Sequence, residues 1–141
     1  CEVWGYRCQD SHVNFSSEIS VTTGFVGDPI RLRQVVDNLA ENALRLSPSG
    51  STLAIRIEQM DKSLVIEVRD SGPGLSPDDQ KVAFDPGALY ERFRGVRPVG
   101  TGIGLALVDR LATGMGGQAR VGSAPEGGAR FTVEIPNRSD T

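Results

Sequence analysis

The sequence predicts an α+β fold in which helices cover one face of a mainly antiparallel sheet. Two stretches, 29–46 and about 102–115, repeat apolar residues at steps of three and four, as amphipathic helices do. Four segments alternate apolar with polar residues, which is typical of strands with one exposed face: 52–58, 63–69, 118–123 and 129–135. The 141 residues fit one domain, 1–141.

The first helix has a clear start. Asp28 is a good N-cap, and Pro29 suits the first helical position, where its missing N–H would have had no helical partner. The apolar stripe of this helix should pack on the sheet: Leu32, Val35, Val36, Leu39, Ala43 and Leu46. Before it, residues 1–22 alternate loosely, which predicts one or two strands. The second helix should end at the glycines 116–117, and a glycine-rich turn at 125–128 joins the last two strands.

Residues 75–99 show no lasting period and contain several prolines and glycines. A segment of that length in a small domain is normally a lid or a disordered stretch, here with room for a short helix at 88–93. Arg92, Arg94 and Arg97 lie in this segment, and their charges could close over phosphate groups. We therefore predict a mobile lid.

The overall charge, the hydropathy and the cysteines argue against several classes of protein. The net charge is -3, and no block of Lys and Arg is dense enough to follow a nucleic-acid backbone, so we expect no nucleic-acid partner. No apolar run approaches the roughly 18 residues of a membrane span, so we expect no membrane contact by this domain. Cys1 and Cys8 have no other metal-ligating residues at a suitable spacing, and two cysteines give little support to a disulfide framework. This favours a cytoplasmic protein. Because the chain starts with Cys1 rather than Met, we expect a piece of a longer protein.

Three glycines, Gly100, Gly102 and Gly104, run directly into the second helix. Such a stretch can bring backbone N–H groups close to phosphate oxygens, and the helix N-terminus adds about half a positive charge. The spacing differs from the dinucleotide fingerprint, which needs G-x-G-x-x-G after a strand, and from a P-loop, which needs Gly-Lys-Ser/Thr. The stretch predicts another type of phosphate site. The alternative is a glycine-rich helix start without a ligand.

Asn38 and Asn42 lie four residues apart in the first helix, so their side chains point the same way. Asn is a poor helix former, so two of them in mid-helix need an explanation. With Arg31 and Arg45 they lie on one flank of the apolar stripe, where amide oxygens could hold Mg²⁺ together with substrate phosphates. The alternative is a solvated helix flank.

Asp70 stands at the end of a predicted strand, and Gly72 and Gly74 let the backbone after it turn sharply. A half-buried carboxylate there is a good acceptor for the exocyclic amine of adenine. In isolation, an ordinary Asp-Ser-Gly turn is the commoner case. Together with the asparagines and the glycine-rich stretch, the pattern favours a nucleotide.

With these residues in place, the chain resembles the catalytic ATP-binding domain of bacterial sensor histidine kinases over about 25–136. These kinases belong to the GHKL superfamily, with gyrase B, mismatch-repair and heat-shock chaperone ATPases. Four motifs occur in the family's order, from the asparagine box through the first glycine box and the phenylalanine box to the second glycine box: 28–43, 70–74, 89–94 and 100–104. The resemblance implies the Bergerat fold, a two-layer α/β sandwich with a mobile ATP lid.

The resemblance also implies roles for the matching positions. Asn42 would hold Mg²⁺ with Asn38 beside it, and both would belong to the catalytic centre. Arg45 would lie near phosphate, Asp70 would bind the adenine amine, and Phe93 would anchor the lid. The implied ATP contacts are Asn38, Asn42, Arg45, Asp70, Gly72, Gly74, Leu75, Phe93, Arg94, Gly100, Thr101, Gly102, Ile103, Gly104 and Leu105.

The activity implied is that of a kinase. Domains of this family bind ATP with Mg²⁺ and donate the γ-phosphate to a histidine on a separate dimerisation domain, and a response regulator acts downstream. Asn38 stands where the hydrolytic ATPases of the superfamily carry a glutamate as general base, and an amide cannot take that proton. The only histidine, His12, has a strand-like context, so we expect a surface or strand residue and an acceptor domain outside the chain. The family likeness implies an inner-membrane sensor with this domain in the cytoplasm.

Some positions depart from the family pattern. Leu46 stands where the family often has an aromatic residue and Ala129 where it often has threonine, so we expect weaker adenine stacking and a weaker water-linked contact. Residues 83–85 also resemble part of the phenylalanine box, so this motif can be aligned with the lid segment in two ways. Two other functions stay open, a serine kinase of the anti-sigma-factor type and a nucleotide-binding pseudokinase module. Replacing Asn42 should abolish phosphotransfer in either kinase, whereas a pure binder has no transfer to lose.

Overall fold

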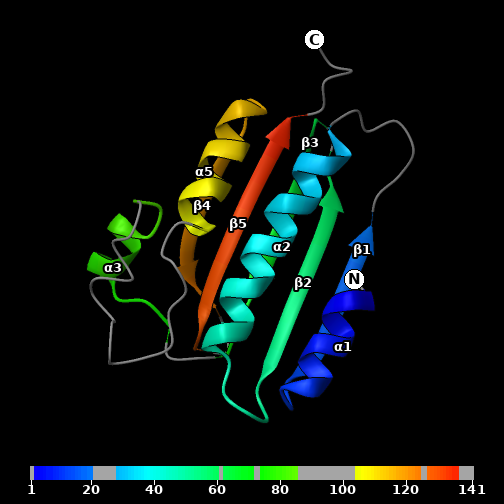
Figure 1. Cartoon of the computed structure of the whole chain (residues 1–141). Coiled ribbons are helices and arrows are strands. Elements are labelled where there is room, and N and C mark those ends of the chain that lie inside the picture. The colour runs from blue at the N-terminus through cyan, green and yellow to red at the C-terminus, as the bar shows by residue number, and fades with distance from the viewer. Residues whose placement is uncertain are drawn as a thin grey trace.

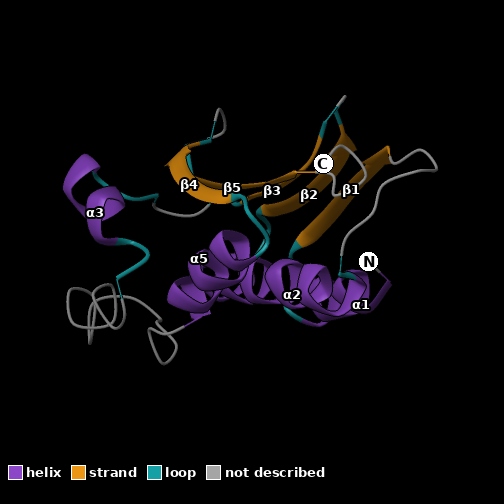
Figure 2. Ribbon diagram, turned by 90° about the horizontal axis from the view of Figure 1, so that it is seen from above, coloured by secondary structure: helices purple, strands orange, loops and turns teal. Residues whose placement is uncertain are grey.

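Three helices lie on one face of a sheet, as Figures 1 and 2 show for the part of the chain that the computed structural model describes. That part comprises residues 2–20, 28–60, 62–71, 74–85, 104–124 and 127–136. Its helices are α1 (Glu2–Asp10), α2 (Pro29–Leu46), α3 (Pro77–Val82) and α5 (Gly104–Gly114). Its strands are β1 (Asn14–Ser20), β2 (Thr52–Gln59), β3 (Ser63–Arg69), β4 (Gln118–Ser123) and β5 (Ala129–Pro136).

Within this described part, the five strands form one sheet in the order β1-β2-β3-β5-β4. The β1–β2 pair is parallel, and the other three pairs are antiparallel. Helices α1, α2 and α5 cover one face, while α3 lies to the side, near the edge strand β4 (Figure 2). The predicted α+β class and the mainly antiparallel sheet are confirmed.

Helix α2 matches its predicted bounds because its start is specified locally. The Oδ1 atom of Asp28 accepts hydrogen bonds from the backbone N–H groups of Ile30, at 3.0 Å, and Arg31, at 3.2 Å. These are two of the donors that have no partner within the helix. Further along, Val35 and Leu39 are fully buried against the inner face of the sheet. The predicted stripe is therefore the surface by which α2 packs on the core, apart from Leu46, whose side chain lies outside the described part.

Residues 1–22 were predicted as one or two strands, and this was wrong for their first half, which forms α1. The helix buries Trp4 and Cys8, one turn apart, while Tyr6 between them is 71% exposed. Two buried side chains give too short a period to be read as a helix. Strand β1 follows as an edge strand, with most of its side chains exposed.

The segment predicted as a lid begins with a short helix, α3, that the absence of a lasting period did not reveal. Ser76 caps it by accepting a hydrogen bond from the backbone N–H of Asp79 at 3.1 Å, and Pro77 takes the first position. After α3, the ring of Phe84 meets Phe131 edge-on, with centroids 6.3 Å apart. Phe84 thus ties the start of this segment to the core, whereas the helix expected at 88–93 lies outside the described residues.

Replacing Phe84 by leucine should lower the free energy of unfolding by about 1 kcal/mol, because the edge-to-face pair is lost while an apolar side chain remains. Urea unfolding followed by circular dichroism measures this change. Phe15 is a matched control, since it packs against the same core from β1. Equal losses in Phe84→Leu and Phe15→Leu would show that the ring pair adds nothing beyond apolar burial.

None of the described helices is long and apolar enough to cross a membrane.

Candidate nucleotide site

The N-terminal end of α5 meets the middle of α2. A Cβ atom built on Gly104 would lie only 3.3 Å from Oδ1 of Asn38, and one on Gly114 would lie 4.0 Å from Nη1 of Arg31. The two helices therefore run side by side in opposite directions, and the flank of α2 that was predicted to border a groove faces α5. Glycine at position 104 allows the close approach of α5 to Asn38.

Asn38 and Asn42 differ in how their amides are satisfied. The Nδ2 group of Asn38 donates a hydrogen bond of 2.7 Å to the backbone oxygen of Gln34, one turn earlier. The Nδ2 group of Asn42 is buried and has no hydrogen-bond partner among the described residues. Leaving a buried donor without a partner costs about 1–3 kcal/mol, so this amide suits a position that a ligand completes.

The chemistry of these side chains fits a magnesium ion. Mg²⁺ prefers oxygen ligands, and it usually shares its coordination shell between a few protein oxygens, water and substrate phosphates. The amide oxygen of Asn42 is such a ligand.

Arg45 and Arg31 lie on the same helix but in different surroundings. The Nη2 atom of Arg45 pairs with Oε1 of Glu41 at 3.4 Å, and its side chain is 30% exposed. Arg31 pairs with Asp28 at 3.5 Å, at the start of α2. It lies eleven residues before Asn42, about 16 Å along the helix. Arg45 is therefore near the asparagines, and Arg31 is not.

Asp70 follows the last residue of β3 and is 1% exposed. Its backbone N–H donates to the carbonyl of Ala129 at 3.1 Å, and its Oδ1 accepts from the Ala129 N–H at 3.3 Å. A buried carboxylate held in this way differs from a solvated Asp-Ser-Gly turn. Ala129, the position where the resemblance implies threonine, thus directly contacts Asp70.

Glycines fit the backbone closely around Asp70. A Cβ atom on Gly128 would collide with the carbonyl oxygen of Asp70. Gly74 has φ +72°, a left-handed conformation, and a Cβ there would lie 3.0 Å from the carbonyl oxygen of Gly127. The segment after β3 therefore packs against the turn between β4 and β5.

The structure places eight of the fifteen predicted ATP contacts. Leu75 and Leu105 are buried members of the core, and the other six are the α2 residues Asn38, Asn42 and Arg45 together with Asp70, Gly74 and Gly104. The remaining predictions lie outside the described residues: Gly72, Phe93, Arg94, Gly100, Thr101, Gly102 and Ile103, with the lid arginines Arg92 and Arg97. His12 is exposed in the turn before β1, with φ 57°, as expected of a surface residue.

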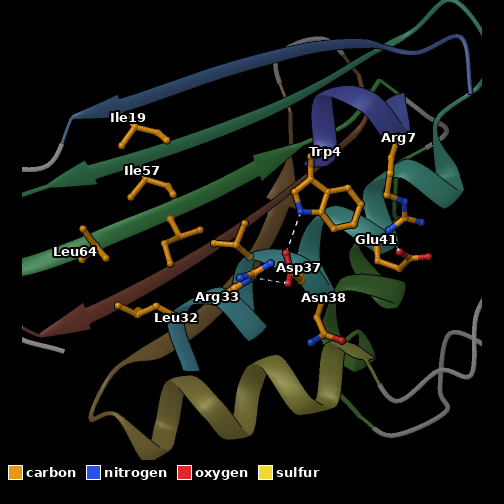
Figure 3. A pocket seen from close by; sticks show the side chains of 12 residues that line it. Trp4, Arg7, Ile19, Leu32, Arg33, Asp37, Asn38, Glu41, Ile57 and Leu64 are labelled. Atoms are coloured by element: carbon orange, nitrogen blue, oxygen red, sulfur yellow. Dashed lines mark hydrogen bonds and ion pairs between the residues drawn. The ribbon is translucent and has the colours of Figure 1, made fainter. Parts of the chain in front are cut away.

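A groove of about 920 Å³ between α1, α2 and the sheet adds residues that the sequence analysis missed (Figure 3). Trp4 and Arg7 of α1 reach across it to Asp37 and Glu41 of α2. The hydrogen bond from Arg7 is the main cause that lowers the pKa of Glu41. No local signal could have revealed these pairs, because more than thirty positions separate their members.

Comparisons with a family model and with known proteins agree on one family. The model of the family described as histidine kinase-, DNA gyrase B-, and HSP90-like ATPase matches residues 27–139. The sensor protein TorS of Escherichia coli is 39% identical over 116 residues, which cover 82% of this chain and 12% of TorS. The signal transduction histidine-protein kinase BaeS of Escherichia coli is 35% identical over 128 residues, 91% of this chain and 27% of BaeS. The chain thus spans a minor part of these relatives.

Solved structures show the same fold. Full-length ShkA in complex with AMPPNP superposes with a TM-score of 0.82 at 28% identity, over 96% of this chain and 28% of ShkA. The mycobacterial sensor histidine kinase MprB gives a TM-score of 0.76 at 28% identity, over 97% of this chain and 89% of that one.

Proposed function

Because the chain belongs to the family of histidine kinase-, DNA gyrase B- and HSP90-like ATPases, we propose that it binds ATP with Mg²⁺ and supplies the γ-phosphate to a histidine. The acceptor histidine lies on a separate dimerisation domain of the same kinase, and a response regulator is the downstream partner. The domain works in the cytoplasm, where ATP is available, as part of an inner-membrane sensor. The relatives are sensor histidine kinases, so the serine-kinase alternative is not favoured.

The observation that carries this proposal is the meeting of α5 with α2 at Gly104 and Asn38. A helix N-terminus carries partial positive charge and attracts phosphate. Asn42, one turn beyond Asn38, brings a buried amide to the same flank of α2. Asp70 supplies a buried acceptor for the adenine amine at the end of β3. We propose that these two sets of residues bind the two ends of one nucleotide.

In phosphoryl transfer the protein mainly positions the groups and stabilises charge. Arg45 and the start of α5 would orient the phosphates, and bound Mg²⁺ would neutralise part of their charge. Asn38 is an amide, and so it cannot accept a proton from water as a general base. The residues of this chain therefore favour holding the γ-phosphate for an external acceptor over hydrolysing it.

The test is a transfer assay with γ-labelled ATP and Mg²⁺, in which this chain is mixed with the dimerisation domain of its own parent protein. We expect label on the dimerisation domain, in an acid-labile bond as expected for phosphohistidine. Acid-stable label would indicate a serine kinase. Binding of ATP without any transfer would indicate a pseudokinase and would contradict the proposal.

Replacing Asn42 by alanine should weaken ATP binding about tenfold in the presence of Mg²⁺, because one metal ligand is lost, and much less in its absence. Titration calorimetry with and without Mg²⁺ measures both affinities. Asn14→Ala is the matched control, since Asn14 is exposed at the start of β1. A loss of ATP affinity that does not depend on Mg²⁺ would show that Asn42 is not a metal ligand.

A further inference from the structure

Helix α1 is attached to α2 by polar contacts on two successive turns (Figure 3). The indole N–H of Trp4 donates to Oδ1 of Asp37 at 3.0 Å. One turn further along both helices, Nη1 of Arg7 pairs with Oε2 of Glu41 at 2.6 Å. The guanidinium carbon of Arg7 also lies 4.5 Å from the centroid of the Trp4 ring, a cation–π distance. Arg7 is therefore held from two sides.

Glu41 divides its carboxylate between two arginines. Oε2 pairs with Arg7 of α1, whereas Oε1 pairs at 3.4 Å with Nη2 of Arg45 on the next turn of α2. The contact with Arg7 is the shorter one. Because Arg45 is the residue proposed to lie near phosphate, the negative charge of Glu41 acts on that end of the site through Arg45.

We propose that Arg7 is a positioning residue for the nucleotide: by taking up part of the charge of Glu41, it weakens the attraction of that carboxylate for Arg45 and so makes Arg45 easier for the phosphate chain to recruit. This inference rests on the proposed function, which assigns Arg45 to phosphate. Through this contact, the docking of α1 on α2 adjusts the charge at the phosphate end of the site.

Electrostatics sets the direction of the effect. Without Arg7, the charge of Glu41 would repel phosphate oxygens, and its carboxylate would pair with Arg45 alone. The side chains of Arg7 and Glu41 are 44% and 42% exposed, so water and salt screen the effect. The penalty should grow with the number of phosphates and should not reach the adenosine end.

The experiment measures the affinities for adenosine, ADP and ATP by calorimetry at low salt, for the wild-type chain and Arg7→Gln. We expect Arg7→Gln to bind ATP about threefold more weakly, to show a smaller loss for ADP, and to bind adenosine as the wild type does. The double variant Arg7→Gln/Glu41→Gln should recover ATP affinity, because the uncompensated carboxylate is gone. Raising the salt concentration should shrink the difference between wild type and Arg7→Gln.

Arg33→Gln is the matched control. It removes the same charge from the same groove, but Arg33 pairs with Asp37 at 3.7 Å, one turn further from Arg45 than Glu41 is. Its ATP affinity should equal that of the wild type. If Arg33→Gln lost as much ATP affinity as Arg7→Gln, the change in net charge alone would explain the effect, and the inference would be overturned.

Two further outcomes separate the inference from a structural role and from the proposed function. If Arg7→Gln weakens the binding of adenosine as much as that of ATP, and the double variant does not recover ATP affinity, Arg7 only stabilises the fold and the inference is wrong. If the wild type binds ATP and Arg7→Gln binds it equally well, the inference fails while the proposed function stands. If the wild type binds no ATP, the proposed function fails first.

Discussion

Replacing Asp70 by asparagine should reduce ATP affinity by at least about 100-fold, because a buried acceptor would be exchanged for a group that is half donor. Asp70 is 1% exposed, and its Oδ1 accepts the N–H of Ala129. An asparagine that keeps this bond must place its NH₂ group where the carboxylate has its second oxygen. Two donors, the NH₂ group and the adenine amine, would then face each other.

Calorimetry with ATP on wild type and Asp70→Asn measures this loss, and thermal unfolding shows whether both are folded. Asp78→Asn is the control for the charge change, since that side chain is 82% exposed at the start of α3. ATP binding by Asp70→Asn at the wild-type level would show that Asp70 does not bind adenine. Asp70 would then keep only the structural role of binding the Ala129 N–H.

The elements with strong local signals were predicted closely. The start of α2 combines an N-cap, a proline and a long apolar period, and its observed bounds are those predicted. β3 and β4 alternate cleanly and also have their predicted bounds. In contrast, Trp4 and Cys8 are the buried ones among the described side chains of α1, and the place of this helix depends on contacts with α2 that no local pattern encodes.

The members of the candidate site stay predictions from the sequence, whereas some of their contacts come only from the structure. Motif order predicts one site for Asn38, Asp70 and Gly104, and the structure shows that Asn38 lies against the start of α5. That Asp70 lies opposite Ala129 follows from the register of β3 on β5, in which Arg69 pairs with Arg130. Register between strands so far apart in sequence is fixed by core packing, which a single sequence does not display. The same holds for the pair of Arg7 and Glu41.

Gly128→Ala should lower the free energy of unfolding by about 3 kcal/mol or more, because the added Cβ meets atoms that cannot move aside cheaply. The atom it would strike is the backbone carbonyl oxygen of Asp70, and it would also press on Oδ1 of that residue. Moving Gly128 away from Asp70 would disturb the two hydrogen bonds between Asp70 and Ala129, which follows Gly128 directly. Molecules that still fold should bind ATP poorly, because Asp70 is displaced.

Gly122→Ala provides the control for this prediction within the same hairpin. Gly122 lies in β4, and a Cβ there would meet nothing within 4 Å, so its stability should stay within about 0.5 kcal/mol of the wild type. Urea unfolding of both variants measures the contrast, and calorimetry with ATP shows whether stability and binding fall together. Equal stability of the two variants would mean that the turn does not pack on Asp70. A Gly128→Ala chain that is destabilised but binds ATP normally would separate the fit of this turn from the adenine contact.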